Sequence, residues 1–271
     1  MALVVNTNLF SMTAQKNLAV HSDKLAGSFS KLSSGLRIVS AADDAAGLGI
    51  SERMRAQIRS LGMAQRNAQD GVSLVQTAEG ALSEVSANLI RMRELSIESA
   101  NGTLNTADRT SLNDEFAELL DEIDRVATDT AFNGISLLDT ASTVSIQVGV
   151  DTGQTIDIVT GDMQTTALGI NALTVTTPAG ASAALATLDT AIDSIVTQRG
   201  TFGASQNRLS SAMRSIATAQ ENLSGAESRI RDVDVASETA ELTKNRILQQ
   251  AATSVLAQAN TQPQLAMSLL Q

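Results

Sequence analysis

Apolar residues recur at every seventh position in the C-terminal half of the chain. The interval holds without exception over seven positions: Leu188, Ile195, Phe202, Leu209, Ile216, Leu223 and Ile230. A seven-residue apolar repeat keeps one stripe of a helix turned toward a partner helix, which is the pattern of a coiled coil. We therefore predict a long helix over residues 182–232, and we call these seven positions the seam.

A second stretch with the same period lies in the N-terminal half. Its repeating positions are Met54, Leu61, Ala68, Val75, Leu82 and Leu89, and Val72, Ala78, Val85 and Met92 widen the stripe. This pattern predicts a helix over residues 45–100. At about 1.5 Å per residue, the seam alone extends roughly 65 Å, so it needs a partner of matching length. We expect the two helices to form an antiparallel coiled-coil or bundle-like rod.

The segment between the two long helices changes its period twice. Residues 106–128 repeat as a shorter amphipathic helix, and residues 132–160 then alternate apolar and polar positions around a turn at Asp151–Gly153. Alternation with a period of two predicts a β-hairpin. Residues 161–181 are rich in Thr, Ala and Gly, and we expect a short surface excursion there. Together with the two long helices, these elements make up a predicted domain of residues 45–233.

The two chain ends carry a third helical pattern. Apolar residues on the N-terminal helix, residues 8–32, are Leu18, Leu25, Phe29 and Leu32, and those on the C-terminal helix are Leu242, Ile247, Leu248, Val255 and Leu256. The C-terminal set covers more than one face, so this helix requires burial on several sides. We expect Pro263 to bend or restart it. We expect these chain ends, residues 1–44 and 234–271, to be marginally ordered alone and to fold on association.

Composition removes several classes of chemistry. The chain has no cysteine, which excludes disulfides and thiolate sites, and its one histidine, His21, excludes histidine clusters. Five Phe without Trp or Tyr leave little for stacking on bases or sugars. Catalytic and phosphate-binding motifs are absent, and Asp43 and Asp44 lie where an acid would cap the helix beginning near Ala45. We predict no catalytic, cofactor-binding or metal-binding residues, and no enzyme activity.

Charge is concentrated in the middle of the sequence. The net charge is −10, and residues 106–162 carry twelve acids against Arg109 and Arg125, so the remainder is balanced. An acidic protein is a poor partner for nucleic acid. No run of about 18 apolar residues is present, so we expect no membrane partner. The N-terminus lacks a secretory signal, which predicts a cytoplasmic location unless export follows another route.

Blocks at both ends and through the helical segments resemble bacterial flagellin, the filament subunit of the flagellum. They are NTN (6–8), KLSSGLRIVSAADDAAGLGISERMRAQIR (31–59), NAQDG (67–71), IRMRELSIESAN (90–101), EIDRVATDTAFNG (122–134), ASQNRLSSAM (204–213) and ENLSGAESRIRDVDVASETAELTKNRILQQAATSVLAQAN (221–260). Two positions differ from the usual family pattern: Val235 replaces an aromatic residue and Ile90 replaces a glutamine. The short middle region resembles a flagellin without large outer domains.

The resemblance implies a secreted, self-assembling structural protein of the extracellular flagellar filament, which serves motility. It implies that the paired terminal helices form the filament core and that the subunit is exported unfolded by the flagellar type III apparatus. The implied partners are further copies of the chain, the export apparatus, a flagellin chaperone, the filament cap and the hook–filament junction proteins. It also implies recognition by the host Toll-like receptor 5 through Arg91, Leu95 and Glu115. The alternative, purely structural interpretation is that Arg91 is solvated or ion-paired and that Leu95 packs between subunits.

Three alternatives remain open at the level of sequence. A hook–filament junction protein shares the terminal pattern, although the match through residues 204–213 favours flagellin. A long helical hairpin is also typical of cytoplasmic signalling proteins, which carry a membrane segment or a sensory domain that is not evident here. An enzyme is the third class, and no motif supports it.

Overall fold

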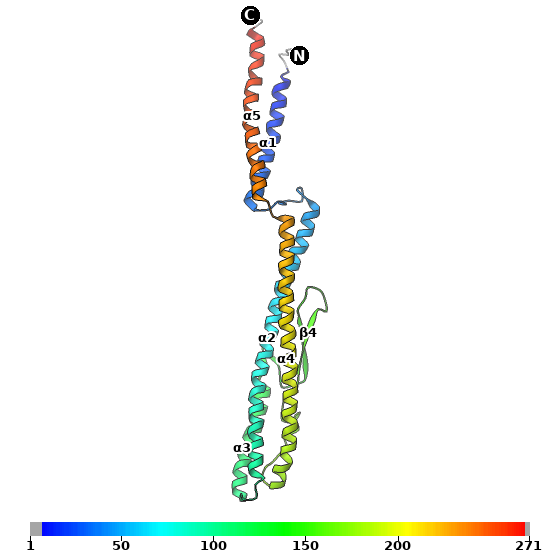
Figure 1. Ribbon diagram of the computed structural model, residues 1–271, viewed down its shortest axis with the longest axis vertical. Coiled ribbons are helices and arrows are strands. Elements are labelled where there is room, and N and C mark those ends of the chain that lie inside the picture. Colours follow the sequence, from blue (N-terminus) through cyan, green and yellow to red (C-terminus); the bar gives the residue numbers. More distant parts are fainter. Residues whose placement is uncertain (1–6, 269–271) are drawn as a thin grey trace. The chain divides into compact units, whose positions relative to one another are not determined.

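The structure, a computed structural model, describes residues 7–268. The outer ends of the predicted segments 1–44 and 234–271 therefore lie outside the described residues. Five helices and four short strands are present in the described chain: α1 (Leu9–Ser34), α2 (Ala45–Ser99), α3 (Thr106–Asp129), β1 (Ala131–Phe132), β2 (Ile135–Ser136), β3 (Ser142–Gln147), β4 (Thr155–Thr160), α4 (Pro178–Arg231) and α5 (Val235–Ser268) (Figure 1). The predicted fold class, mainly α with a small β-hairpin region, is confirmed.

The chain forms two compact units. One comprises residues 57–221 and is called here the central unit. The other, called the terminal unit, is built from the chain ends up to Ala56 and from Asn222 onward. Both α2 and α4 contribute to both units, whereas we expected the division at the connectors near residues 44 and 234.

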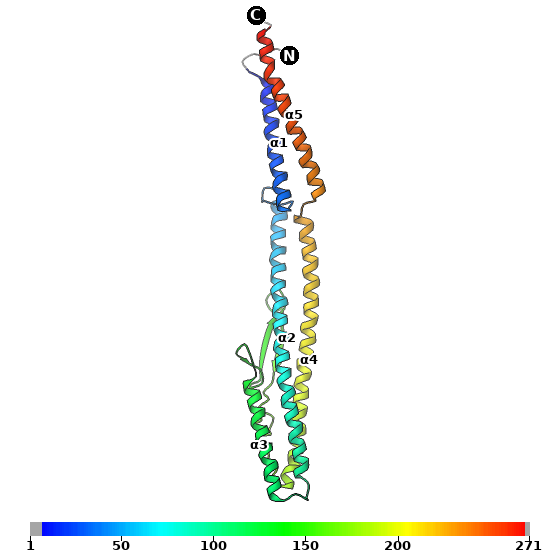
Figure 2. The same cartoon turned by 90° about the vertical axis from the view of Figure 1, so that its left-hand side faces the viewer.

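Helices α2 and α4 run antiparallel through the central unit, and both views show them side by side (Figures 1 and 2). Arg93 of α2 pairs with Asp189 of α4 at 2.7 Å, and Arg199 pairs with Glu79 at 3.6 Å, which fixes this register. Seam residues Leu188, Ile195, Phe202 and Leu209 are completely buried, as are the α2 positions Ala68, Val75, Leu82 and Leu89. The seven-residue repeat thus marks the packed faces of both helices.

Helix α3 adds a third layer to this pair. It begins with a capping box, in which Asn105 Oδ1 accepts from the Asp108 N–H and Asp108 accepts from the Asn105 N–H. Phe116, Ile123 and Ala127 are its buried face. Four of its acids, Asp114, Glu115, Glu118 and Asp121, are exposed to solvent.

Strands β3 and β4 form the predicted antiparallel hairpin, in which Val144 lies opposite Ile158 and Ile146 opposite Ile156. Ile156 and Ile158 contribute to the core of the central unit. A smaller hairpin, β1–β2, precedes it and turns at Asn133 and Gly134, both at positive φ. An Asn-Gly pair favours such a two-residue turn because both residues adopt the left-handed region readily.

Residues 161–177 differ from the surface excursion that we expected. Met163, Ile170 and Val175 are buried in the core. The Asp124 carboxylate accepts bonds from the Thr165 amide and hydroxyl at 2.7 and 2.8 Å, and Asn113 Oδ1 accepts from the Val175 amide at 3.0 Å. Two side chains of α3 therefore hold this Thr-rich segment against the core.

Helix α4 also begins four residues before its predicted start at Ser182, at Pro178. Proline is favoured in the first turn of a helix because the amide it lacks would have no partner there. The Thr177 hydroxyl accepts from the Gly180 amide at 3.1 Å and caps this end. Pro178 therefore starts helix α4, whereas we expected residues 161–181, which include Pro178, to form a surface excursion.

Arg109 is a buried cation that has no carboxylate partner within residues 7–268. Its guanidinium donates to the carbonyls of Ser99, Asn101 and Leu104 at 3.0, 2.8 and 2.7 Å, and so caps the C-terminal end of α2 and the following turn. We predict that Arg109→Met, which keeps the apolar stem, lowers the free energy of unfolding by about 2–4 kcal/mol, because three buried carbonyls lose a charged donor. Chemical denaturation measures the effect; Arg208→Met, at an exposed arginine, is the control and should change stability by under about 0.5 kcal/mol.

Candidate interaction surface of the terminal helices

Helices α1 and α5 pack against each other in the terminal unit (Figures 1 and 2). The residues of α1 that are buried or half-buried recur every three or four positions: Ser11, Ala14, Leu18, His21, Leu25, Ser28 and Leu32. The matching residues of α5 include Leu242, Asn245, Leu256 and Ala259. Those below a tenth exposed are all small or polar. Apolar burial within this pair is therefore slight.

Polar contacts make up part of the pairing between the two helices. Asn8 Nδ2 donates to the Ala259 carbonyl at 2.7 Å, and the Ser11 hydroxyl donates to Asn260 Oδ1 at 2.8 Å. Farther along, His21 Nδ1 lies 3.4 Å from Oδ1 of the buried Asn245. The helices are thus held in register by specific side chains.

Pro263 does not restart α5, which continues as one helix from Val235 to Ser268. Proline has no N–H, so the carbonyl of Ala259, four residues earlier, lacks its partner within the helix. The Asn8 amide supplies that missing donor. The N-terminal helix thereby compensates for the proline that we expected to interrupt the C-terminal one.

Large apolar side chains lie on the outer faces of both helices. Phe29 is 62 % exposed, and Leu9 of the same helix 70 %. On α5, Val235, Ile247 and Val255 are each close to 60 % exposed. Contiguous exposed apolar surface is rare on soluble monomers and marks an interaction site.

The predicted terminal residues therefore fall into two groups. Phe29, Ile247, Leu248 and Val255 are exposed, whereas Leu18, Leu25, Leu32, Leu242 and Leu256 are half-buried on the faces between α1 and α5. The sequence analysis missed Leu9, Phe10, Met12 and Val235, which belong to the exposed group. Leu9, Phe10 and Met12 lie too close in sequence for all three to face one partner helix. This spacing could have predicted that some of them are exposed.

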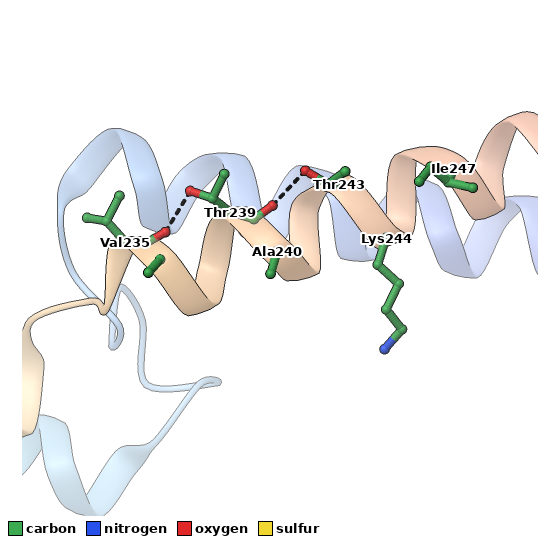
Figure 3. A pocket seen from close by; sticks show the side chains of 7 residues that line it. Val235, Thr239, Ala240, Thr243, Lys244 and Ile247 are labelled. Atoms are coloured by element: carbon green, nitrogen blue, oxygen red, sulfur yellow. Dashed lines mark hydrogen bonds between the residues drawn. The ribbon is translucent and has the colours of Figure 1, made fainter.

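A shallow groove follows one outer face of α5. It is lined by Val235, Ala236, Thr239, Ala240, Thr243, Lys244 and Ile247 (Figure 3). The hydroxyls of Thr239 and Thr243 donate to the carbonyls four residues earlier, at 2.6 and 2.8 Å. Because those hydroxyls are occupied, the groove is mainly apolar. It suits an apolar side of another helix.

The connector between α1 and α2 is tied to the end of α4 within the terminal unit. The Arg37 amide donates to the Arg231 carbonyl at 2.6 Å, and the Val233 amide donates to the Gly35 carbonyl at 3.0 Å. Arg37 Nε also donates to the Ile230 carbonyl at 3.2 Å. The chain segments before and after the two long helices are thus joined by backbone pairing.

The two adjacent acids near the start of α2 have different roles. Asp44 caps the helix by accepting from the Gly47 amide at 2.9 Å. Asp43 accepts from the Ser40 amide at 2.8 Å, the Ser40 hydroxyl at 3.0 Å and the Val39 amide at 3.2 Å. The Ser40 bonds, followed by that of Val39 and the charge of Lys31, hold the pKa of Asp43 below its ordinary value.

We predict that Asp43→Asn lowers the melting temperature at neutral pH, because the neutral amide oxygen accepts these bonds more weakly. A depressed pKa stabilises the fold above the unfolded-state value and loses that effect as pH falls through the folded-state value. The difference between Asp43→Asn and the unchanged chain should therefore shrink as pH falls through the folded-state pKa of Asp43. Thermal unfolding across pH checks this; Asp23→Asn, at an exposed position of α1, is the control at neutral pH and should leave the melting temperature nearly unchanged.

The residues assigned to a receptor by resemblance do not share one exposed surface. Arg91 Nε pairs with Glu115 at 2.8 Å and its Nη1 pairs with Glu94 at 3.1 Å, all three being exposed. Glu115, then Glu94, raises the pKa of the Arg91 guanidinium. Leu95 is completely buried in the core. The four-residue spacing placed Arg91 and Leu95 on one side of α2, but only Arg91 reaches solvent.

The described residues contain no group of three or more acidic or histidine side chains placed to hold a metal ion. Within residues 7–268, no helix combines the length and the hydropathy needed to cross a bilayer. Among the described residues, the exposed apolar side chains of α1 and α5 are the candidate interaction surface.

Comparison with known proteins agrees with that class. Residues 5–143 match the bacterial flagellin N-terminal helical region, and residues 185–270 match the bacterial flagellin C-terminal helical region. The chain is 46% identical over 271 residues to a flagellin of Halalkalibacterium halodurans, covering 99% of this chain and 100% of that protein. It is 44% identical over 301 residues to a flagellin of Bacillus subtilis, covering 98% of this chain and 99% of that protein.

Two solved structures are similar as well. The crystal structure of Bacillus cereus flagellin aligns with a TM-score of 0.52 and 39% identity, covering 56% of this chain and 88% of that one. A putative flagellar hook-associated protein from Vibrio parahaemolyticus aligns with a TM-score of 0.61 over 70% of this chain and all of that one, but at 15% identity it shares the fold alone.

The structure is that of a mainly helical protein with exposed apolar side chains on its first and last helices. The chain belongs to the bacterial flagellin family. Its short length fits a member without large outer domains, since it aligns end to end with relatives of similar length.

Proposed function

We propose that this chain is a structural subunit that self-assembles into the extracellular filament of a bacterial flagellum and serves motility. The observation that carries the proposal is the exposed apolar surface on α1 and α5, which have little apolar burial between them. In a filament, neighbouring copies would cover Phe29, Ile247 and Val255. Full-length identity to flagellins favours this function over that of a junction or signalling protein.

Seeded polymerisation tests the proposal. Purified chain is added to short filament fragments, and elongation is followed by electron microscopy and light scattering. Uniform tubes that grow from the seeds support a filament subunit. A chain that stays monomeric at all concentrations, with both ends resistant to protease, would contradict it.

The resemblance extends the proposal to export and to partners. The chain would leave the cell unfolded through the flagellar type III apparatus, with a flagellin chaperone before export and the cap and junction proteins as neighbours at the filament ends. The slight apolar burial between α1 and α5 supports an end region that is easily unfolded. Secretion of the chain by a cell lacking the export apparatus would refute this route.

Recognition by the host Toll-like receptor 5 remains a proposal by resemblance. Arg91 and Glu115 are exposed and could contact a receptor, while Leu95 would contribute by supporting α2 from the core. Arg91→Ala should weaken binding of the monomer to the receptor ectodomain, since it removes a charged contact. The test requires Arg93→Ala, which also removes an ion pair of α2, as its control. Equal loss in both variants would exclude a specific role of Arg91.

A further inference from the structure

Two stretches of the central unit, one on each long helix, contain arginines and no acids. Residues 57–69 of α2 and 194–220 of α4 hold Arg59, Arg66, Arg199, Arg208 and Arg214 without a single Asp or Glu. Gly71 faces Leu209, so the antiparallel course brings Arg66 to about the level of Arg214. We call these two stretches the basic sector.

Most arginines of this sector have no anionic partner. Arg199 pairs with Glu79, but no ion pair in residues 7–268 involves Arg59, Arg66, Arg208 or Arg214, and all four are exposed. Arg59 and Arg66 are seven residues apart and therefore share a face of α2. Met63, which is 51% exposed, lies between them on that face.

Helix α3 carries the complementary pattern. Asp114, Glu118 and Asp121 are exposed, and none of them forms an ion pair in the described part of the chain. Their spacing of four and three residues places them on one face, with Ala117 beside them. We call them the acidic stripe. It spans seven residues, as do Arg59 and Arg66, which is a rise of about 10 Å in each helix.

The two patterns cannot meet within one molecule. The Arg91–Glu115 pair places the acidic stripe beside residues near 85–92 of α2. That level lies about 26 residues beyond Arg59 and Arg66, or roughly 40 Å along the helix at 1.5 Å per residue. No side chain reaches across such a distance. A second copy displaced by that distance along the direction of α2 would bring the two to the same level.

We propose that the acidic stripe of one subunit docks on the basic sector of the next copy, with Met63 and Ala117 in the middle of the contact. The inference rests on the proposed function and names the surfaces that contact each other. Because the two surfaces differ, the contact is head-to-tail, and such a contact generates an open filament when it does not close into a ring. Opposite charges also steer an incoming subunit and fix its register.

Charge exchange tests the docking on intact chains. The basic variant is Arg59→Glu/Arg66→Glu, the acidic variant is Glu118→Lys/Asp121→Lys, and the swapped chain carries all four substitutions. At about 0.05 M salt, each double variant should elongate wild-type seeds at least tenfold more slowly than the wild-type chain does, because like charges then face each other. The swapped chain should elongate seeds of its own kind at close to the wild-type rate. On wild-type seeds it should be slow, since each of its surfaces then meets a like charge.

Controls separate this contact from general effects of charge and folding. Glu84→Lys/Asp193→Lys changes the net charge as much as the acidic variant does, at exposed residues outside the stripe, and should elongate normally. Recovery by the swapped chain excludes misfolding as the cause of the slow rates.

Two results would overturn the docking. One is an elongation rate that is unchanged from wild type in both double variants; the other is a swapped chain that shows no recovery. If elongation is unchanged and the basic variant also loses binding to phosphatidylglycerol vesicles, the sector is assigned to an anionic lipid surface instead. If the wild-type chain itself does not elongate, the proposed function fails as well, so the two failures are distinguishable.

Discussion

A chain cut to residues 45–233 is expected to remain folded and to lose filament formation entirely. The central unit keeps its own core, with Leu82, Phe116, Phe202 and Leu209 all buried, so secondary structure and cooperative unfolding should persist. What is lost is the apolar surface of α1 and α5. Seeded elongation measures the effect, and we expect no growth from any seed at concentrations where the intact chain grows.

Point substitutions separate the exposed surface from the mere presence of the ends. Phe29→Ser together with Ile247→Ser keeps both helices and removes two side chains that are each about 60% exposed. Elongation should fall strongly, because each loses roughly 1.5–3 kcal/mol of burial that assembly would supply. Ser22→Ala with Thr253→Ser, at exposed polar positions of the same helices, is the control. Filament growth by the truncated chain would show that the ends are dispensable.

Phe202→Ala is expected to lower the free energy of unfolding of the central unit by about 3–5 kcal/mol. The ring is fully buried at the middle of the seam, and its removal leaves a cavity between α4 and its neighbours. Because typical domains are stable by only about 5–15 kcal/mol, this is a large fraction of the total. Urea denaturation followed by circular dichroism measures it.

Phe29→Ala provides the same chemical change at an exposed phenylalanine. It should alter the unfolding free energy of the monomer by under about 0.5 kcal/mol. We thus expect different effects from the two substitutions: Phe202→Ala lowers the stability of the monomer, and Phe29→Ala lowers the rate of assembly. Equal destabilisation by both substitutions would contradict the placement of Phe29.

The long helices were predictable because a single repeat determines them. Positions from Leu188 to Leu209 share one stripe, and a matching stripe runs through α2, so each long helix finds its partner by period alone. The ends of α2 and α3 followed from local signals, the cap at Asn105 among them. Such features depend on residues close in sequence.

The segment 161–177 was not predictable in the same way. Thr165 and Val175 are fixed by Asp124 and Asn113, which lie 41 and 62 residues earlier. No pattern within the segment predicts those hydrogen bonds, because a composition rich in Thr, Ala and Gly is also typical of loops. Tertiary contacts therefore decided its burial.

The association surface was predictable only in part. The apolar pattern grouped Leu18 and Leu25, which are half-buried, with Phe29, which is exposed. A helix with apolar residues on several sides shows that more than one partner is needed, but not which side meets which partner. The same limit applies to Leu95, since a shared side with Arg91 on α2 does not specify exposure.

The hydrogen bond from Asn8 to the Ala259 carbonyl makes the packing of the C-terminal helix depend on the N-terminal end of the chain. A helix that contains proline carries a vacant acceptor one turn earlier, and here Asn8, near the opposite terminus, donates to it. A copy that had lost its first eight residues would still build α5, but with an unsatisfied carbonyl at Ala259. Loss of the first residues therefore destabilises the C-terminal helix, and we expect a truncated copy to assemble less well than an intact one.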